Sequence, residues 1–244
     1  MNFNYPIKTI FKHEITKLNH NLLPHDFNAA DKRTYRAASD VVIAILDEMG
    51  IASAKAQGLL KPITSWDKLR NSEHTVYILV DREDNGGNGS VVGLLKIGKK
   101  KLYVFDSDSE CHESVALCVL DFYVHESKQR MGCGRKLFDY MLHEENVEPQ
   151  KLAIDRPSHK FLLFLQKYYH LHDVVPQSNN FVVFTGFFPE RMSNINDSYS
   201  GSPHRMSTGS PKYSPGSNPY HNTGRHTAYK RESTIGQIIH SSPV

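Results

Sequence analysis

Cysteine is scarce in this chain of 244 residues, and no two cysteines have C-x-x-C spacing. The three cysteines are Cys111, Cys118 and Cys133. An odd count without paired spacing is typical of a reducing compartment, so we expect no structural disulfide and no zinc site. His125 and Glu126 begin the zinc motif H-E-x-x-H, but Gln129 occupies the position of the second histidine. We therefore expect a protein without a bound metal.

Long hydrophobic runs are also missing. Residues 1–14 lack the apolar segment of a secretory signal peptide. No stretch approaches the roughly 18 uninterrupted apolar residues of a membrane-spanning helix. These two absences predict a cytoplasmic chain without a membrane span.

An excess of charge of one sign is absent from residues 1–188, where 23 Lys and Arg balance 23 Asp and Glu. This balance argues against a nucleic-acid partner. Residues 189–244 differ, with 6 basic against 3 acidic residues and 22 of 56 positions occupied by Ser, Pro or Gly. Such a segment cannot bury enough apolar area to offset its ordering entropy. The sequence therefore predicts a folded domain over 1–188 and a disordered, basic tail over 189–244.

The common nucleotide motifs G-x-G-x-x-G and G-x-x-x-x-G-K-[ST] are absent too. What is present is an apolar segment at 116–124, the loop Q-R-M-G-C-G at 129–134, and an amphipathic helical pattern after it. Glycines in a strand–loop–helix unit let backbone N–H groups approach an anion at the positive end of the helix dipole. This arrangement predicts a phosphate-binding loop, although paired glycines can also simply close a tight turn.

Periodicity elsewhere predicts one α/β sheet domain with helices interspersed among strands. The first long helix is expected to begin after the capping residue Asp31 and to stop at Gly58, with Gly50 as a point where it could divide. Two further helices are expected over 65–70 and 158–169. Besides 116–124, strands are expected over 15–23, 76–80, 91–97, 101–105, 151–154 and 181–187.

Four blocks of the sequence resemble the α-tubulin N-acetyltransferase family of the GNAT superfamily. They are ASAKAQ at 52–57, LDFYVHES at 120–127, LAIDRPS at 152–158 and NNFVVF at 179–184. The match runs in order from about residue 3 to residue 188 without large gaps. The resemblance implies a single mixed GNAT-type β-sheet flanked by helices, and an enzyme that transfers acetyl from acetyl-CoA to a lysine of α-tubulin in microtubules.

The resemblance also implies an acetyl-CoA site built from two segments, the glycine loop and the helix after Ser158. Arg130 and Arg135 are expected near the phosphates, which the backbone amides of 131–134 would hold. The expected cofactor-binding residues are Phe122, Tyr123, Val124, His125, Gln129, Arg130, Met131, Gly132, Cys133, Gly134, Arg135, Ser158, His159, Lys160, Phe164 and Lys167.

Acetyl transfer to a lysine requires a neutral amine, an oriented pair of reactants and a stabilised oxyanion. A free lysine with a pKa of about 10.4 is neutral in roughly one molecule per few thousand at pH 7, a cost of about 4–5 kcal/mol. Candidates for the proton acceptor are Asp155, Asp121 and Glu126. The resemblance points to Gln57, Asp155 and Cys118 as catalytic positions.

Each of these three positions has an alternative role. Gln57 has no titratable proton, so it can orient the lysine or a water but cannot be the base. Asp155 could instead order the loop before Pro157, or cap the helix that follows. A lone cysteine in a strand is usually a small hydrophobic residue, and direct transfer needs no acyl-cysteine, so we interpret Cys118 as a wall of the site.

Lys96, Lys99, Lys100 and Lys101 form the densest basic run, which is either a solvated face or a docking patch for acidic tubulin. The candidate substrate-binding residues are Lys96, Lys100, Asp121, Arg156 and Asn180. We expect a monomer that associates with microtubules of the cytoskeleton. The alternatives are a GNAT enzyme with another protein or a small amine as acceptor, and a microtubule-binding protein with little turnover.

Overall fold

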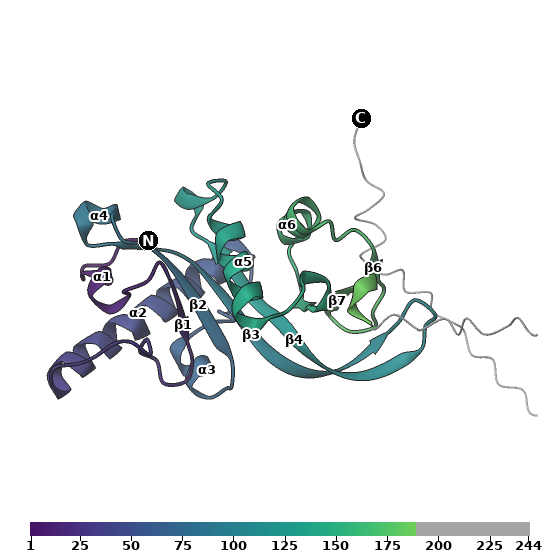
Figure 1. The fold of residues 1–244 in the computed structure, drawn as a ribbon, viewed down its shortest axis with the longest axis horizontal. Coiled ribbons are helices and arrows are strands. Elements are labelled where there is room, and N and C mark those ends of the chain that lie inside the picture. Colours follow the sequence, from purple (N-terminus) through teal and green to yellow (C-terminus); the bar gives the residue numbers. More distant parts are fainter. Residues whose placement is uncertain (189–244) are drawn as a thin grey trace, which may run out of the picture. The chain divides into compact units, whose positions relative to one another are not determined.

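A seven-stranded mixed sheet organises the computed structural model, which describes residues 1–188; the predicted tail lies outside these residues (Figure 1). The strand order is β1-β2-β3-β4-β5-β7-β6, and only the β4–β5 pair is parallel within this sheet. The strands are β1 (Ile15–Leu18), β2 (Thr75–Asp81), β3 (Ser90–Phe105), β4 (Cys111–Val124), β5 (Ala153–Asp155), β6 (Val174–Val175) and β7 (Phe181–Phe184). The α-helices are α1 (Ile7–Ile10), α2 (Lys32–Ala56), α3 (Trp66–Arg70), α4 (Asp84–Gly87), α5 (Cys133–Glu145) and α6 (His159–Tyr169). This sheet flanked by helices confirms the predicted fold class.

The long helix α2 covers one face of the sheet. Asp31 caps it, because its carboxylate accepts a hydrogen bond of 2.7 Å from the backbone N–H of Thr34. Its buried face packs against residues of β2 and β3 in one apolar cluster. The helix runs unbroken through Gly50, so the expectation that it could divide there is wrong. A Cβ at position 50 would lie 1.9 Å from the carbonyl oxygen of Thr64, and glycine is therefore what allows this close approach.

Helices α5 and α6 cover the opposite face (Figure 1). Leu137, Phe138 and Met141 of α5 are fully buried against the sheet. The Phe122 ring of β4 lies 5.0 Å from the Phe161 ring and 5.4 Å from the Phe164 ring of α6, measured between centroids. These aromatic contacts fix α6 beside the strand that precedes the glycine loop.

Strands β3 and β4 form a long hairpin that extends past the other strands (Figure 1). The sequence predicted two strands, over 91–97 and 101–105, but β3 is continuous because β4 pairs with it as far as the Phe105–Cys111 pair. The predicted strand at 116–124 likewise begins earlier, at Cys111. Gly98 and the lysines that follow it suggest a break only when the partner strand is unknown.

Smaller differences occur elsewhere. β1 ends at Leu18 rather than residue 23, and β7 ends at Phe184, after which a 3₁₀ turn begins. β5 begins two residues later and ends one residue later than predicted, and the two-residue β6 was not predicted. No helix in residues 1–188 is long and apolar enough to cross a membrane.

Candidate acyl-transfer site

A β-bulge in β4 shapes the centre of the site. Lys96 of β3 faces Asp121, whereas the next residue, Ile97, faces Val119, so Leu120 is an extra residue without a partner on β3. The bulge changes the alternation of side chains along β4. Leu120 packs with Cys118 in one cluster, while Val119 packs beneath α5 and α6. Asp121 is consequently directed toward α2 instead of toward α5.

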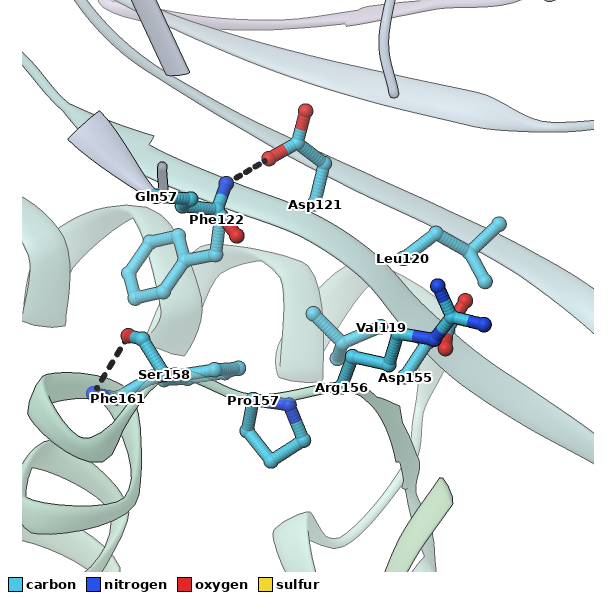
Figure 2. Close-up of a pocket in the computed structure, with 10 residues that line it drawn as sticks. All are labelled: Gln57, Val119, Leu120, Asp121, Phe122, Asp155, Arg156, Pro157, Ser158 and Phe161. Carbon is cyan, nitrogen blue, oxygen red and sulfur yellow. Dashed lines mark hydrogen bonds between the residues drawn. The ribbon is translucent and has the colours of Figure 1, made fainter. Parts of the chain in front are cut away.

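A small pocket of about 20 Å³ opens beside this bulge, where the end of α2 meets the loop between β5 and α6 (Figure 2). It brings together residues that are far apart in the sequence, among them the predicted catalytic residues Gln57 and Asp155. The residues that line it are Gln57, Val119, Leu120, Asp121, Phe122, Asp155, Arg156, Pro157, Ser158 and Phe161. Val119, Leu120, Pro157 and Phe161 were not among the predicted site residues.

Gln57, the C-cap residue of α2, is held by two hydrogen bonds of its side-chain amide. The nitrogen Nε2 donates to Ser53 Oγ at 2.8 Å and to Asp121 Oδ1 at 3.0 Å. Ser53 Oγ in turn donates to Asp121 Oδ1 at 2.7 Å, and Thr64 Oγ1 donates to Asp121 Oδ2 at 2.6 Å. Asp121 is only 4% exposed. Its oxygens are therefore occupied by three donors, which favours a structural role over that of a proton acceptor.

Asp155 ends β5 and remains half-buried at the pocket. Burial raises the pKa of its carboxyl group above the ordinary value, and the positive charges of Arg156 and Lys100 oppose this rise. A raised carboxyl pKa makes the group a better proton acceptor. Of the three candidate bases, Asp155 is the one that both lines the pocket and has a raised pKa.

Cys118 lies under the site and not on its surface. Its side chain is 0% exposed, and its thiol contacts the carbonyl oxygen of Ala116 at 3.5 Å. Burial raises the pKa of the Cys118 thiol to about 12, and the charge of Asp155 adds to this effect while Lys100 opposes it. A thiol with such a pKa is protonated at neutral pH and is a poor nucleophile.

The predicted phosphate loop has the backbone geometry of an anion site. Gly132, the N-cap of α5, has a left-handed φ of 82° and offers no side chain to cap the helix. A Cβ there would have no atom within 4 Å, so the space beside the loop is open. Gln129 Nε2 donates to the Val124 carbonyl at 2.8 Å, which ties the loop to the end of β4. The first N–H groups of α5 are thus available to a phosphate group.

The other predicted cofactor residues differ in their burial and contacts. Phe122 and Phe164 are in contact, and Ser158 Oγ caps α6 by accepting from the Phe161 N–H at 3.3 Å. His159, Lys160 and Lys167 are exposed along α6, as are Arg130, Met131 and Arg135 at the loop. Tyr123 differs, because its side chain packs in the cluster under α2 and its hydroxyl donates to Glu126 Oε2 at 2.8 Å. Only the backbone of Tyr123 can face the loop.

The basic run does not form one surface. Lys96 is 3% exposed, and its ammonium group donates to the Ile63 carbonyl at 3.0 Å, so the expectation of a solvated or docking face is wrong for this residue. Burial lowers the pKa of Lys96 to about 8, despite the opposing effect of Asp121. Lys99 and Lys101 are exposed, and Lys101 pairs with Glu113 at 2.8 Å. Lys100 lies near Asp155 and Cys118 and influences the pKa of both.

The two remaining candidate substrate residues, Arg156 and Asn180, are exposed and lie side by side. The backbone N–H of Arg156 donates to the carbonyl of Asn180 at 3.0 Å. Arg156 has a left-handed φ of 42°, unusual for a residue with a side chain. This turn places Arg156 next to Asp155 at the pocket.

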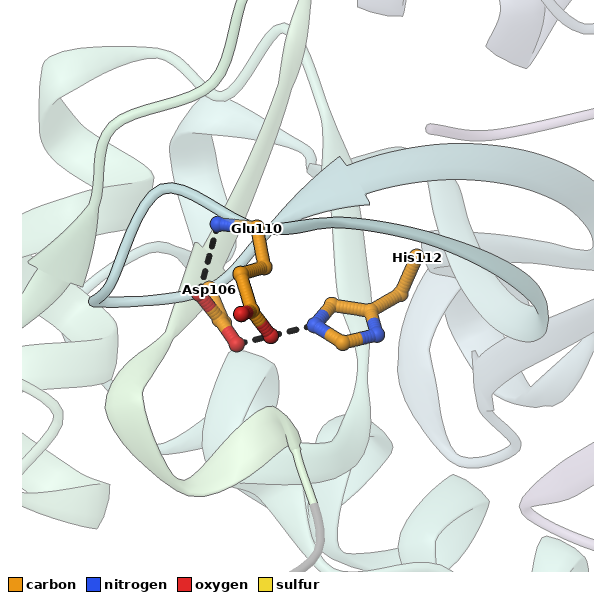
Figure 3. A group of neighbouring side chains, drawn as sticks. All are labelled: Asp106, Glu110 and His112. Atoms are coloured by element: carbon orange, nitrogen blue, oxygen red, sulfur yellow. Dashed lines mark hydrogen bonds and ion pairs between the residues drawn. The ribbon is translucent and has the colours of Figure 1, made fainter. Parts of the chain in front are cut away.

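A separate cluster of ligand-type side chains lies at the end of the β3–β4 hairpin, formed by Asp106, Glu110 and His112 (Figure 3). His112 Nε2 is 2.8 Å from Asp106 Oδ2, and Asp106 Oδ1 accepts from the N–H groups of Asp108 and Glu110, both at 2.9 Å. The bond from His112 lowers the pKa of Asp106 to about 2. These hydrogen bonds hold the two sides of the hairpin turn together.

Together, the mixed sheet, the bulged central strand and the glycine loop at the start of α5 define an acetyltransferase of the GNAT class. Residues 3–214 match the family model described as GNAT acetyltransferase, Mec-17, and the chain belongs to this family.

Curated relatives agree with this assignment. The chain is 49% identical over 197 residues to "Alpha-tubulin N-acetyltransferase" of Anopheles gambiae, a match that covers 81% of this chain and 40% of that protein. Against the protein of the same name from Trichoplax adhaerens it is 50% identical over 197 residues, covering 77% and 82% respectively. The chain thus spans less than half of one relative and most of the other.

Among solved structures, the xEco2 acetyltransferase domain bound to a K105-CoA conjugate aligns with a TM-score of 0.40 and 16% identity. The alignment covers 70% of this chain and 91% of that one. At this score the similarity is too weak for any comparison of individual residues.

Proposed function

We propose that this chain transfers the acetyl group of acetyl-CoA to a lysine side chain of α-tubulin. The observation that carries the proposal is a pocket in which Gln57 and Asp155 meet the bulge of β4. Phe122, which lines this pocket, also lies beside Gly134 of the glycine loop. The names of the curated relatives, which are α-tubulin N-acetyltransferases, support tubulin as the acceptor. Acetyl-CoA supplies the acetyl group as a reactive thioester.

The glycine loop and α6 would hold the cofactor. The N–H groups at the start of α5 donate to the pyrophosphate, and the exposed Arg130 and Arg135 add positive charge. Phe122 and Phe164 provide an apolar wall between the loop and the pocket. The remaining predicted cofactor residues, on the loop and along α6, stay predictions of this proposal.

Asp155 accepts the proton that the lysine ammonium must lose before its nitrogen can bond to the acetyl carbon. Gln57 orients the amine through its amide oxygen, and backbone N–H groups of the bulge stabilise the developing oxyanion. Cys118 supports the floor of the site. The neutral amine attacks the thioester carbon directly, the carbon–sulfur bond breaks, and CoA leaves as a thiolate that takes up the remaining proton of the attacking nitrogen. No acetyl group is attached to the enzyme at any step.

The proposal extends to partners and location. With tubulin as the acceptor, the chain would act in the cytoplasm on microtubules. We also propose that it is a monomer that binds no nucleic acid and uses no metal. The half-buried Lys100 and the exposed Arg156 and Asn180 would contact tubulin near the pocket. Lys96 and Asp121 are buried and would support the site without touching tubulin.

In the decisive experiment, the purified protein is incubated with labelled acetyl-CoA and either polymerised tubulin or histone peptides. We expect labelled lysine in α-tubulin and background labelling of the peptides. In Gly134→Trp the new Cβ lies 3.4 Å from Phe122 and 3.8 Å from Phe164, so the indole crowds the wall of the proposed cofactor site. This variant should lose acetyl-CoA binding measured by calorimetry, while its far-UV circular dichroism remains that of the folded wild type. Preferred labelling of the peptides would refute tubulin as the acceptor, and unchanged acetyl-CoA affinity in a folded Gly134→Trp variant would refute the loop assignment.

A further inference from the structure

A buried polar network lies directly behind Gln57, and the proposed mechanism makes no use of most of it. Asp121 accepts hydrogen bonds from Gln57, Ser53 and Thr64, at 3.0, 2.7 and 2.6 Å. Lys96 faces Asp121 across the β3–β4 ladder at the bulge. A carboxylate that is 4% exposed would be costly without these partners. Because so many partners meet at one carboxylate, we infer that the network has a role in the site.

The network determines which way the Gln57 amide points. Both N–H bonds of Nε2 are used, one toward Ser53 Oγ and one toward Asp121 Oδ1. If the amide were flipped, its oxygen would face the carboxylate oxygen of Asp121, which can donate no proton while ionised. The flipped arrangement is therefore disfavoured, and the carbonyl oxygen points away from Asp121 (Figure 2). Within residues 1–188 nothing donates a hydrogen bond to that oxygen.

The network also secures the loop that follows Gln57. Thr64 Oγ1 bonds to Asp121, and the preceding residue, Ile63, accepts from the ammonium group of Lys96 at 3.0 Å. Residues 58–60 of this loop are exposed, whereas Thr64 is fully buried. One carboxylate thus connects the end of α2, the strand β4 and the far end of the loop.

We propose that Ser53, Thr64, Lys96 and Asp121 are positioning residues that present the carbonyl oxygen of Gln57 as a fixed acceptor for an N–H of the incoming lysine amine. This inference rests on the proposed lysine acetylation, whose acceptor is a primary amine. An amide oxygen accepts from an amine without removing its proton, so the network orients the nucleophile while Asp155 remains the base. The network acts on turnover through Gln57 and makes no contact with acetyl-CoA.

Kinetics with polymerised tubulin test this directly. Ser53→Ala and Thr64→Val each remove one hydrogen bond and should lower kcat about 3- to 10-fold, with the KM for acetyl-CoA unchanged within about twofold. Thr64→Ser restores the donor and should regain the activity that Thr64→Val loses. Ser39→Ala on the same helix and Thr16→Val, at a buried threonine whose hydroxyl has no partner in the described chain, are matched controls that should leave kcat unchanged.

A double-mutant cycle separates positioning from a general structural role. In a Gln57→Ala background the network has nothing to orient, so adding Ser53→Ala should change kcat by less than about twofold. If the two substitutions multiply instead, Ser53 acts independently of Gln57 and the proposal is wrong.

A second readout requires no catalysis. The side-chain NH₂ signals of Gln57, assigned by their loss in Gln57→Ala, should shift in Thr64→Val, because the change reaches Gln57 through Asp121, and should not shift in Thr16→Val. Wild-type protein that fails to acetylate tubulin would refute the proposed function, while these signals would still report on the network. Unmoved Gln57 signals in folded Thr64→Val would overturn the network itself.

Discussion

At the scale of single residues, Asp155 and Cys118 show how one physical effect has opposite consequences for two groups. Burial raises the pKa of both side chains. For Asp155 the rise improves a proton acceptor, whereas for Cys118 it removes the thiolate that a nucleophile would need. The sequence indicated both residues by resemblance, but their roles depend on burial, which the sequence alone does not give.

The buried thiol predicts an order of reactivity among the cysteines. Cys111 is exposed, Cys133 is partly exposed and Cys118 is buried. With iodoacetamide at pH 7.5, we expect alkylation of Cys111 first, then Cys133, and of Cys118 only after unfolding. Peptide mass spectrometry over time measures this order. Rapid alkylation of Cys118 in the folded protein, or its acetylation by acetyl-CoA alone, would mean that the thiol is accessible and active.

The charge of Arg156 predicts a shift in the pH–rate profile. Arg156 lowers the pKa of Asp155, so Arg156→Gln should raise that pKa and move the acidic limb of the kcat profile to higher pH. Relative to the wild type, the kcat of the variant is reduced most at acidic pH and approaches the wild-type value at high pH. Arg36→Gln, an exposed change on α2, is the control. A limb that stays in place would exclude Asp155 as the titrating base.

At the scale of helices and strands, local sequence patterns predict where the helices begin and end, but they do not predict how the strands pair. The Asp31 cap and the spacing of apolar residues predict α2, and the glycines of 132–134 predict the turn into α5. The continuity of β3 and the bulge at Leu120 depend on strand pairing, which is not encoded locally. Ser53 precedes Gln57 by one helical turn, a spacing that could have indicated it, but no local pattern marks Thr64 as its partner.

The close approach of α2 to Thr64 predicts the effect of a single methyl group. Alanine favours a helix over glycine by about 1 kcal/mol. At position 50, however, the new Cβ would overlap the Thr64 carbonyl oxygen. We therefore expect Gly50→Ala to destabilise the fold by about 1–3 kcal/mol, measured by denaturant unfolding. Ser39→Ala, at a partly exposed site of the same helix, should be nearly neutral. A stabilised Gly50→Ala would contradict the close packing.

At the scale of the whole molecule, residues 1–188 contain the sheet, both layers of helices and the proposed site. The fold class could be predicted because the apolar periodicity and the family resemblance agree. The family resemblance also indicated six of the ten residues that line the pocket. Their geometry could not be predicted, since the pocket joins α2, β4 and β5 through contacts between segments that are distant in sequence. The burial of Lys96 is the clearest case, because its neighbours in the sequence suggest a solvated surface.

The composition of 189–244 predicts that this segment adds little to stability. A chain that ends at Phe188 should melt within a few degrees of the full chain, because the removed residues are mostly polar, Pro or Gly. Differential scanning calorimetry of the two chains measures the difference. A drop in Tm of ten degrees or more would show that the removed segment packs on the domain.

Thr64 links the packing of α2 to the buried polar network. Its backbone oxygen packs against Gly50, and its hydroxyl donates a hydrogen bond to Asp121. Displacing this residue from the α2 side would loosen the carboxylate, and with it Gln57, before the sheet itself melts. Position 50 is therefore a natural place to make a conditional allele. Cells carrying Gly50→Ala should lose acetylated tubulin on a modest rise in temperature and recover it on cooling, while the amount of protein stays constant.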